Sequence, residues 1–161
     1  FKVYHPAVFY AVYFTVRGAD IDYEAAIGGV RVAKEHLRDN ERIPKEERTA
    51  KDDDALVSLQ LENEMLQRGV QFLPIELGKS RASKYVVEDG KVRLPFTALR
   101  GLGEAAAVAL EKATIDGQEY ISVEELQQAS GVAASVFEKL RSVGALGSLP
   151  ETRQVDLFSL L

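Results

Sequence analysis

The sequence predicts a mainly α-helical protein that carries one small β-hairpin. Helix-start and helix-stop residues punctuate most of its 161 residues. An Asp89-Gly90 turn separates two short β-prone segments, and a Gly-Leu-Gly turn at 101–103 precedes an alanine-rich helix. A content of 46% hydrophobic residues suits one or two ordinary globular domains.

Two helices are expected in the first 40 residues. Residues 7–16 follow Pro6, which suits a first helical position. They are almost all apolar or aromatic, which is typical of a helix that is buried on every side. A second helix is expected over 23–38, where the pair Gly28-Gly29 weakens it or allows close packing.

A third helix begins with three consecutive carboxylates, Asp52 to Asp54, and ends at Gly69. These carboxylates indicate either a metal site or acidic residues favoured by the positive end of the helix dipole. Consecutive helical residues point in different directions and cannot converge on one ion, which favours the second interpretation. His5 and His36 have no partners at metal-ligand spacing. The absence of cysteine excludes disulfides and thiolate metal sites.

The middle of the chain is expected to be extended. Residues 70–77 predict a strand that Pro74 restricts to a sheet edge. Asp89-Gly90 then joins two β-prone segments into a hairpin over 85–94. After the hairpin, two helix–turn–helix units in tandem are expected, with helices at 95–99, at 104–115, after a capping box at Ser122 to Glu125, and at 133–143.

The turn inside the first of these units suggests a ligand. Gly101 and Gly103 permit a backbone that side chains would obstruct, and Leu102 between them can point into the core. The amides of Gly101, Gly103 and Glu104 then lie at a helix N-terminus, unpaired within the helix and at the positive end of its dipole. Such a terminus binds anions, phosphate above all. The alternative is a turn that only packs helices.

Charge is unevenly distributed along the chain. The net charge of −5 means that any nucleic-acid site must be a local patch. Between Gly78 and Gly103, however, six residues are basic and two are acidic. This basic stretch leads directly into the glycine turn and favours nucleic-acid binding over a merely solvated face: Lys79, Arg81, Lys84, Lys91, Arg93 and Arg100. No apolar run approaches the ~20 residues of a membrane span, so no membrane partner is expected.

Three stretches, in order along nearly the whole chain, share their motifs with one family. His5 to Arg17 is similar to that family's fingers helix. Arg68 to Phe72, with residues 80–82 and 95–103, is similar to its passage from the fingers into a tandem helix-hairpin-helix domain. Gln154-Val155-Asp156-Leu157-Phe158 is similar to its clamp-binding pentapeptide. The chain thus resembles the C-terminal part of bacterial C-family replicative DNA polymerases of the PolC type, the polymerase III alpha subunit of Gram-positive bacteria.

The resemblance implies four regions: a helical fingers segment at 1–70, an extended and β-hairpin connection at 71–94, a tandem helix-hairpin-helix DNA-binding domain at 95–149, and a clamp-binding tail at 150–161. Residues expected to contact the backbone of duplex primer–template DNA, without sequence preference, are Lys79, Arg81, Lys84, Arg100, Gly101, Leu102 and Gly103. Residues expected to contact the sliding clamp, the beta subunit, are Gln154, Asp156, Leu157 and Phe158.

The family also implies Mg²⁺-dependent nucleotidyl transfer by palm aspartates, in the bacterial cytoplasm at the nucleoid. No acidic constellation here matches that palm, so this segment is expected to hold no catalytic residue, metal or cofactor of its own. The chain begins at Phe1 rather than Met and is expected to be a piece of a longer protein. Glu104 departs from the anion-binding pattern, and Ser159-Leu160-Leu161 extends past the pentapeptide.

Two other functions remain open from the residues. A base-excision glycosylase also uses a helix-hairpin-helix, but its loop and catalytic Asp follow the hairpin differently: here Asp116-Gly117 comes early and lacks a proline. The other is a protein-interaction module in which the hairpin packs helices only. For the tail, with adjacent Leu157 and Phe158, the alternative to binding a partner is docking back on the domain.

Overall fold

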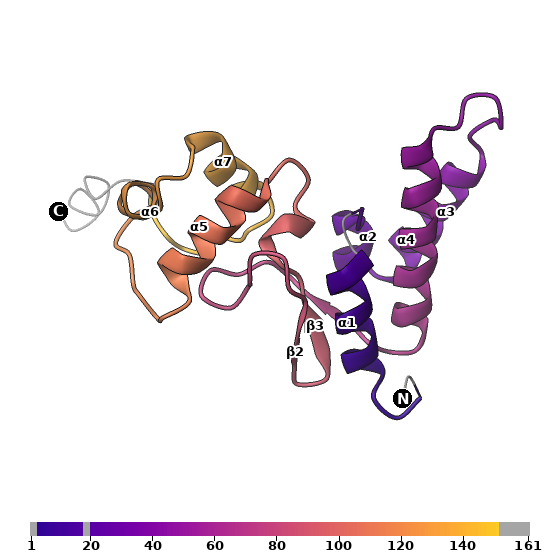
Figure 1. The fold of residues 1–161 in the computed structure, drawn as a ribbon, viewed down its shortest axis with the longest axis horizontal. Helices are drawn as coiled ribbons and strands as arrows, with labels where there is room; N and C mark the ends of the chain where they lie inside the picture. The colour runs from indigo at the N-terminus through magenta and orange to yellow at the C-terminus, as the bar shows by residue number, and fades with distance from the viewer. Residues whose placement is uncertain (1–2, 18–19, 152–161) are drawn as a thin grey trace. The chain divides into compact units, whose positions relative to one another are not determined.

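The computed structural model describes residues 3–17 and 20–151 and confirms the mainly helical fold (Figure 1). Among these residues there are seven α-helices, a three-stranded sheet and one 3-10 helix. The helices are α1 (Pro6–Arg17), α2 (Tyr23–Gly28), α3 (Val30–Glu41), α4 (Ala50–Gln67), η1 (Phe96–Ala98), α5 (Glu104–Thr114), α6 (Val123–Ser130) and α7 (Ala134–Ser142). The strands are β1 (Phe72–Leu73), β2 (Val86–Glu88) and β3 (Lys91–Arg93).

The described residues form two compact units, and the chain passes between them three times. The first unit contains residues up to 73 together with 84–94, and the second contains 74–83 together with residues from 95 onward. The stretch 71–94 therefore contributes to both units.

The sheet belongs to the first unit and has the strand order β1-β3-β2. β2 and β3 pair antiparallel, with Val87 opposite Val92, and β1 pairs parallel to β3. Asp89 and Gly90 have φ of 50° and 75°, and positive φ at both turn residues is what a tight hairpin with the right twist requires. The predicted hairpin is confirmed, and β1 lies at the sheet edge directly before Pro74, as expected.

Helix α1 contacts the sheet through one face only. Its Phe14 ring is centred 5.5 Å from the rings of both Phe72 and Tyr85, and Phe14 is 2% exposed. On the opposite face Val12 is 60% exposed and Val16 76% exposed. The expectation that this helix is buried on every side is therefore wrong. Only side chains spaced three or four residues apart can reach a single sheet, and no other described element covers the second face.

The prediction of a single helix over 23–38 is also wrong, because the helix is interrupted at Gly29 and forms two helices, α2 and α3. Gly29 has φ of +83°, a left-handed conformation that glycine adopts without steric cost. Its amide still donates to Ala25 O at 3.2 Å and so completes α2. The two helices pack with α4 around Ala25, Ala33 and Leu59.

The start of α4 explains two of the three consecutive aspartates. Thr49 and Asp52 form a capping box: the Asp52 amide donates to Thr49 Oγ1 at 3.3 Å, and the Thr49 amide donates to Asp52 Oδ2 at 2.8 Å. The Thr49 amide, and after it the Thr49 hydroxyl, which donates to Asp52 Oδ2 at 3.0 Å, hold the pKa of Asp52 below its usual value. Asp53 pairs with Arg48 at 3.0 Å. Their interpretation as helix-start carboxylates is confirmed.

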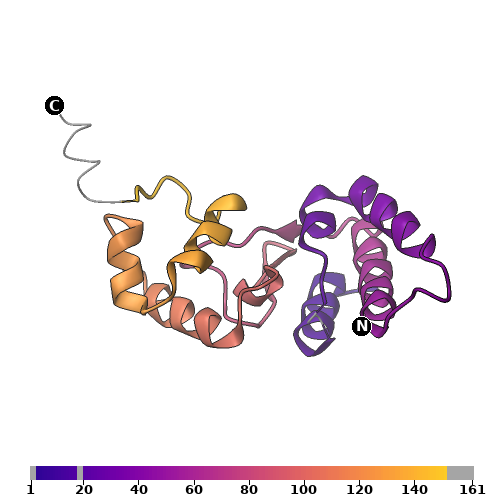
Figure 2. The same cartoon turned by 90° about the horizontal axis from the view of Figure 1, so that it is seen from above.

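The second unit is built on α5, α6 and α7, drawn from salmon to yellow in Figure 2. Leu110, Leu126 and Leu140, one from each helix, are fully buried. Residues 74–83, which precede these helices in the sequence and are not helical, also belong to this unit and contact α5. The Ala82 amide donates to Glu111 Oε2 at 2.8 Å, and Glu111 is a half-buried residue near the C-terminal end of α5.

Candidate nucleic-acid interface

The first hairpin consists of η1, the turn at 99–103 and α5. Leu102 is 5% exposed, and its amide donates to Leu99 O at 3.1 Å, so the turn is anchored in the core as expected. Gly101 has φ of +86°, which a residue with a side chain rarely adopts. The glycine at 101 is therefore required by the backbone of the turn itself.

The N-terminus of α5 has no capping side chain. Gly103 is its N-cap residue, and the amides of the first helical turn have no hydrogen-bond acceptor among the described residues. The next helix shows the contrast: Ser122 Oγ accepts from the Glu125 amide at 3.2 Å, and Glu125 Oε2 accepts from the Ile121 amide at 2.8 Å. The α5 terminus thus presents donors and a positive dipole end, whereas α6 satisfies its own.

The backbone requires glycine at position 101 but not at position 103. The φ of −73° at Gly103 is ordinary, and a Cβ atom built on Gly103 would meet nothing within 4 Å. The expectation that a side chain would obstruct the backbone is therefore wrong at 103. It is correct at 101. Since the fold leaves the space open, any requirement for glycine at 103 would come from a ligand that approaches the backbone closely.

Fewer of the predicted basic residues are free to bind a phosphate than the sequence suggests, because several are paired with carboxylates. In the second unit, Lys79 Nζ lies 3.8 Å from Glu76 Oε2, and Arg81 Nη1 lies 3.1 Å from Glu111 Oε1. In the first unit, Arg93 is 5% exposed and its Nε donates to Glu88 Oε2 at 2.5 Å, so it is not part of a surface patch. The remaining three predicted cations are exposed and have no carboxylate within 4 Å among the described residues: Lys84 and Lys91 in the first unit and Arg100 in the second.

Sequence reasoning missed one residue at the first hairpin. Lys139, on α7, donates from Nζ to the Gly101 carbonyl oxygen at 3.2 Å. The two residues are 38 positions apart, and no local pattern in the sequence marks the lysine. Only the packing of α7 against the turn brings them together.

The second hairpin repeats the backbone of the first. Gly131 has φ of +71°, Val132 is 5% exposed, and Ala133 is an N-cap residue without a capping side chain. These three residues correspond to Gly101, Leu102 and Gly103 thirty positions earlier. The prediction of two helix–turn–helix units in tandem is confirmed.

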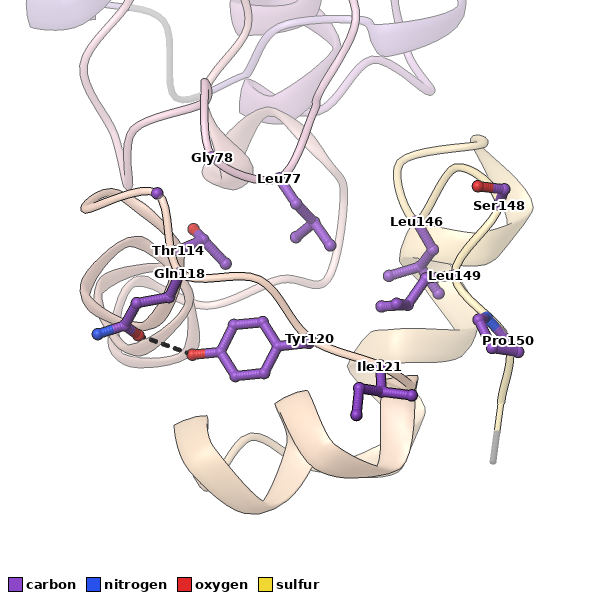
Figure 3. Close-up of a pocket in the computed structure, with 11 residues that line it drawn as sticks. Leu77, Gly78, Thr114, Gln118, Tyr120, Ile121, Leu146, Ser148, Leu149 and Pro150 are labelled. Carbon is purple, nitrogen blue, oxygen red and sulfur yellow. Dashed lines mark hydrogen bonds between the residues drawn. The ribbon is translucent and has the colours of Figure 1, made fainter. Parts of the chain in front are cut away.

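An open groove of about 530 Å³ also lies in the second unit (Figure 3). Leu77, Ile121, Leu146 and Leu149 give it an apolar lining, and the Tyr120 hydroxyl lies 2.9 Å from Gln118 Oε1. Among the described residues that line it, none is a lysine, arginine, histidine, aspartate or glutamate.

The predicted clamp-contacting residues Gln154, Asp156, Leu157 and Phe158 lie outside the described residues. Just before them the chain is held at the start of α6: the Val123 amide donates to Pro150 O at 2.8 Å, and the Glu124 amide donates to Glu151 O at 3.1 Å. Within the described part of the chain, no group of three His, Asp or Glu side chains could hold a metal ion. Nor is any helix there long and apolar enough to cross a membrane.

Comparisons with known proteins agree with this geometry. Residues 69–155 match the family described as "Helix-hairpin-helix motif", and the chain belongs to that family. The chain is also homologous to a segment of PolC-type DNA polymerase III. It is 35% identical over 159 residues to that protein from Streptococcus agalactiae and 37% identical over 158 residues to that from Thermotoga petrophila. Each match covers 98% of this chain and 11% of the relative, so the chain spans about a ninth of the length of these relatives.

Proposed function

We propose that this chain is the part of a PolC-type replicative polymerase that holds duplex DNA by its phosphate backbone. The observation that carries the proposal is the uncapped N-terminus of α5 behind the left-handed turn at Gly101. The homology over 98% of the chain to a segment of PolC supports it.

In this proposal the phosphates meet, within the second unit, the backbone of Gly101 to Gly103 and the side chains of Lys79, Arg81 and Arg100. Lys84, in the first unit, is proposed as a separate phosphate contact. Phosphate contacts carry no base information, so binding is independent of sequence. Lys79 and Arg81 must exchange a carboxylate partner for a phosphate, which reduces their net gain. Arg100 has no carboxylate within 4 Å among the described residues, so its substitution should weaken binding more.

Fluorescence anisotropy of the full chain on two duplexes of equal length and unrelated sequence tests this function. About three to five neutralised phosphates predict that the logarithm of affinity falls with the logarithm of salt concentration with a slope of about −2.7 to −4.5. Equal affinity for both duplexes and that slope support the proposal. Salt-independent binding would contradict it and favour a protein-interaction module.

The intact parent would be the enzyme, a DNA-directed DNA polymerase of the bacterial cytoplasm. Its Mg²⁺-dependent transfer requires carboxylates that converge on two ions about 4 Å apart. The described residues of this chain do not fit such a site, since Asp52 caps α4 and Asp53 pairs with Arg48. No step of the reaction is assigned to this segment.

We further propose that the tail tethers the polymerase to the sliding clamp. Leu157 and Phe158 are adjacent and apolar, so in an extended chain they diverge and can fill two pockets, while Gln154 fixes register through its amide. Such a contact would be roughly micromolar, because a short peptide commonly pays an ordering cost when it binds. Tethering to a DNA-bound domain then raises its effective concentration.

Titration of the full chain against a bacterial sliding clamp tests the tether, with the Leu157→Ala, Phe158→Ala double variant as control. The double variant should bind at least thirtyfold more weakly, since a buried aromatic anchor is commonly worth ~2 kcal/mol or more. Equal binding by both chains, or by neither, would remove the tail from the functional account.

A further inference from the structure

We infer that Lys139 supplies a cation to the phosphate contact of the first hairpin, although it belongs to the last helix of the second. The inference rests on the proposed DNA-binding function and extends the site to a residue from another helix.

The geometry places the ammonium group of Lys139 against the glycine turn. Nζ donates to Gly101 O at 3.2 Å and lies 2.4 Å from the position that a Cβ on Gly101 would occupy. The side chain is half-buried, so its stem is held against the unit while its end reaches the turn. Because glycine has no Cβ, residue 101 leaves the room that Nζ fills.

The partner of Lys139 is neutral, whereas three other cations of the second unit are paired with carboxylates. Lys79, Arg81 and Arg141 pair with Glu76, Glu111 and Glu151 respectively. No carboxylate lies within 4 Å of Lys139 among the described residues. An ammonium group has three donors and the Gly101 carbonyl takes one, so charge and hydrogen-bonding capacity both remain for an anion.

The positive charge of Lys139 also offsets the repulsion between the Glu104 carboxylate and a bound phosphate. Glu104 is exposed at the first position of α5, where its carboxylate opposes an incoming phosphate. A cation held at the same turn offsets that charge. Lysine is well suited to the task, because it binds phosphate as a point charge and needs no fixed planar geometry.

Three variants of the full chain test this role in the same salt titration on duplex DNA. Lys139→Gln removes the charge, and Lys139→Arg keeps it. Lys112→Gln is the matched control: Lys112 is exposed in the last turn of α5, at the end opposite the glycine turn, and has no carboxylate within 4 Å among the described residues. Thermal melting establishes that each variant is folded. If Lys139→Gln does not fold, Lys139→Met, which keeps the apolar stem, takes its place.

We expect Lys139→Gln to lower affinity about three- to tenfold at low salt and to reduce the salt slope by about 0.9, the value for one phosphate. Lys139→Arg should keep the slope, and Lys112→Gln should change it little. Suppose that the affinity of the unaltered chain falls steeply with salt, and that Lys139→Gln and Lys112→Gln show identical salt slopes. This result would overturn the inference about Lys139 but leave the proposed DNA-binding function standing. If the unaltered chain does not bind duplex DNA, the proposed function fails and this inference fails with it.

Discussion

At the scale of single residues, Glu62 stands apart because its carboxyl group is wholly buried in the first unit. Its Oε2 accepts from the Asp22 amide at 3.3 Å, and its Oε1 has no partner among the described residues. Burial raises the pKa of Glu62 to about 9, and the Asp22 amide opposes that shift only in part. The folded protein therefore holds this side chain in its neutral form at pH 7.

This burial predicts a stability that falls as pH rises. Unfolded Glu62 loses its proton near pH 4.5 and the folded form near 9, so the stabilisation is complete below 4.5 and is lost as pH rises through about 9. The glutamine in Glu62→Gln cannot ionise. At pH 8 the free energy of unfolding of this variant should therefore be higher than that of the unaltered chain by roughly 2–4 kcal/mol. Urea unfolding between pH 5 and 9 checks this.

Parallel pH profiles for the two chains would contradict the buried neutral carboxyl. A shallow slope should persist in Glu62→Gln, because the hydrogen bond from His36 to Asp22 raises the pKa of that imidazole. Its stabilisation is likewise complete below its unfolded value near 6.5 and is lost as pH rises.

At the scale of elements, the two helix starts in the second unit are built for different purposes. Ser122 and Glu125 close the N-terminus of α6, whereas Gly103 leaves that of α5 open. The caps that stabilise a helix and the donors that bind an anion draw on the same amides. Stability and binding should therefore respond to different residues.

We expect Ser122→Ala to destabilise the second unit by about 1 kcal/mol, because Ser122 is 3% exposed and its hydroxyl caps α6. DNA affinity at a temperature well below the melting transition should not change. Ser135→Ala, an exposed serine in the first turn of α7, is the control for the loss of a hydroxyl. A fall in DNA affinity in Ser122→Ala alone would show that capping and binding are not separate.

Helix ends and the hairpin were predictable from sequence because their signals are local. Asp89-Gly90, Ser122 and Gly131 act within three or four residues of themselves. The pair Gly28-Gly29 marked a weak point of the expected helix, but the sequence left open whether the helix breaks there. The exposed face of α1 was not predictable, since it depends on what that helix packs against. The same holds for the candidate site: Arg81 meets Glu111 thirty residues away, and Lys139 meets Gly101 across two helices.

At the scale of the whole molecule, the two units are interleaved along the chain. Residues 74–83 belong to the second unit: Ile75 is 2% exposed, the Phe96 amide donates to Arg81 O at 2.9 Å, and the Thr97 amide donates to Ala82 O at 3.0 Å. A cut before Pro95 would remove these contacts from the hairpin domain.

A fragment of residues 95–161 should therefore melt at a lower temperature than one of residues 74–161, and less cooperatively. The reason is that the shorter fragment leaves Glu111 without the Ala82 amide and exposes the apolar surface that Ile75 covers. Differential scanning calorimetry compares them. Equal melting temperatures would show that 74–83 adds nothing to the stability of this unit.

The central claim is that the open N-terminus of α5 binds a DNA phosphate, and Gly103→Ser tests it most directly. A serine at this position fits in the open space and can accept from the first-turn amides, as Ser122 does in α6. It should raise stability slightly, by a few tenths of a kcal/mol, and lower duplex affinity about tenfold, because it takes the donors a phosphate would use. Unchanged affinity in a folded Gly103→Ser chain would contradict the account.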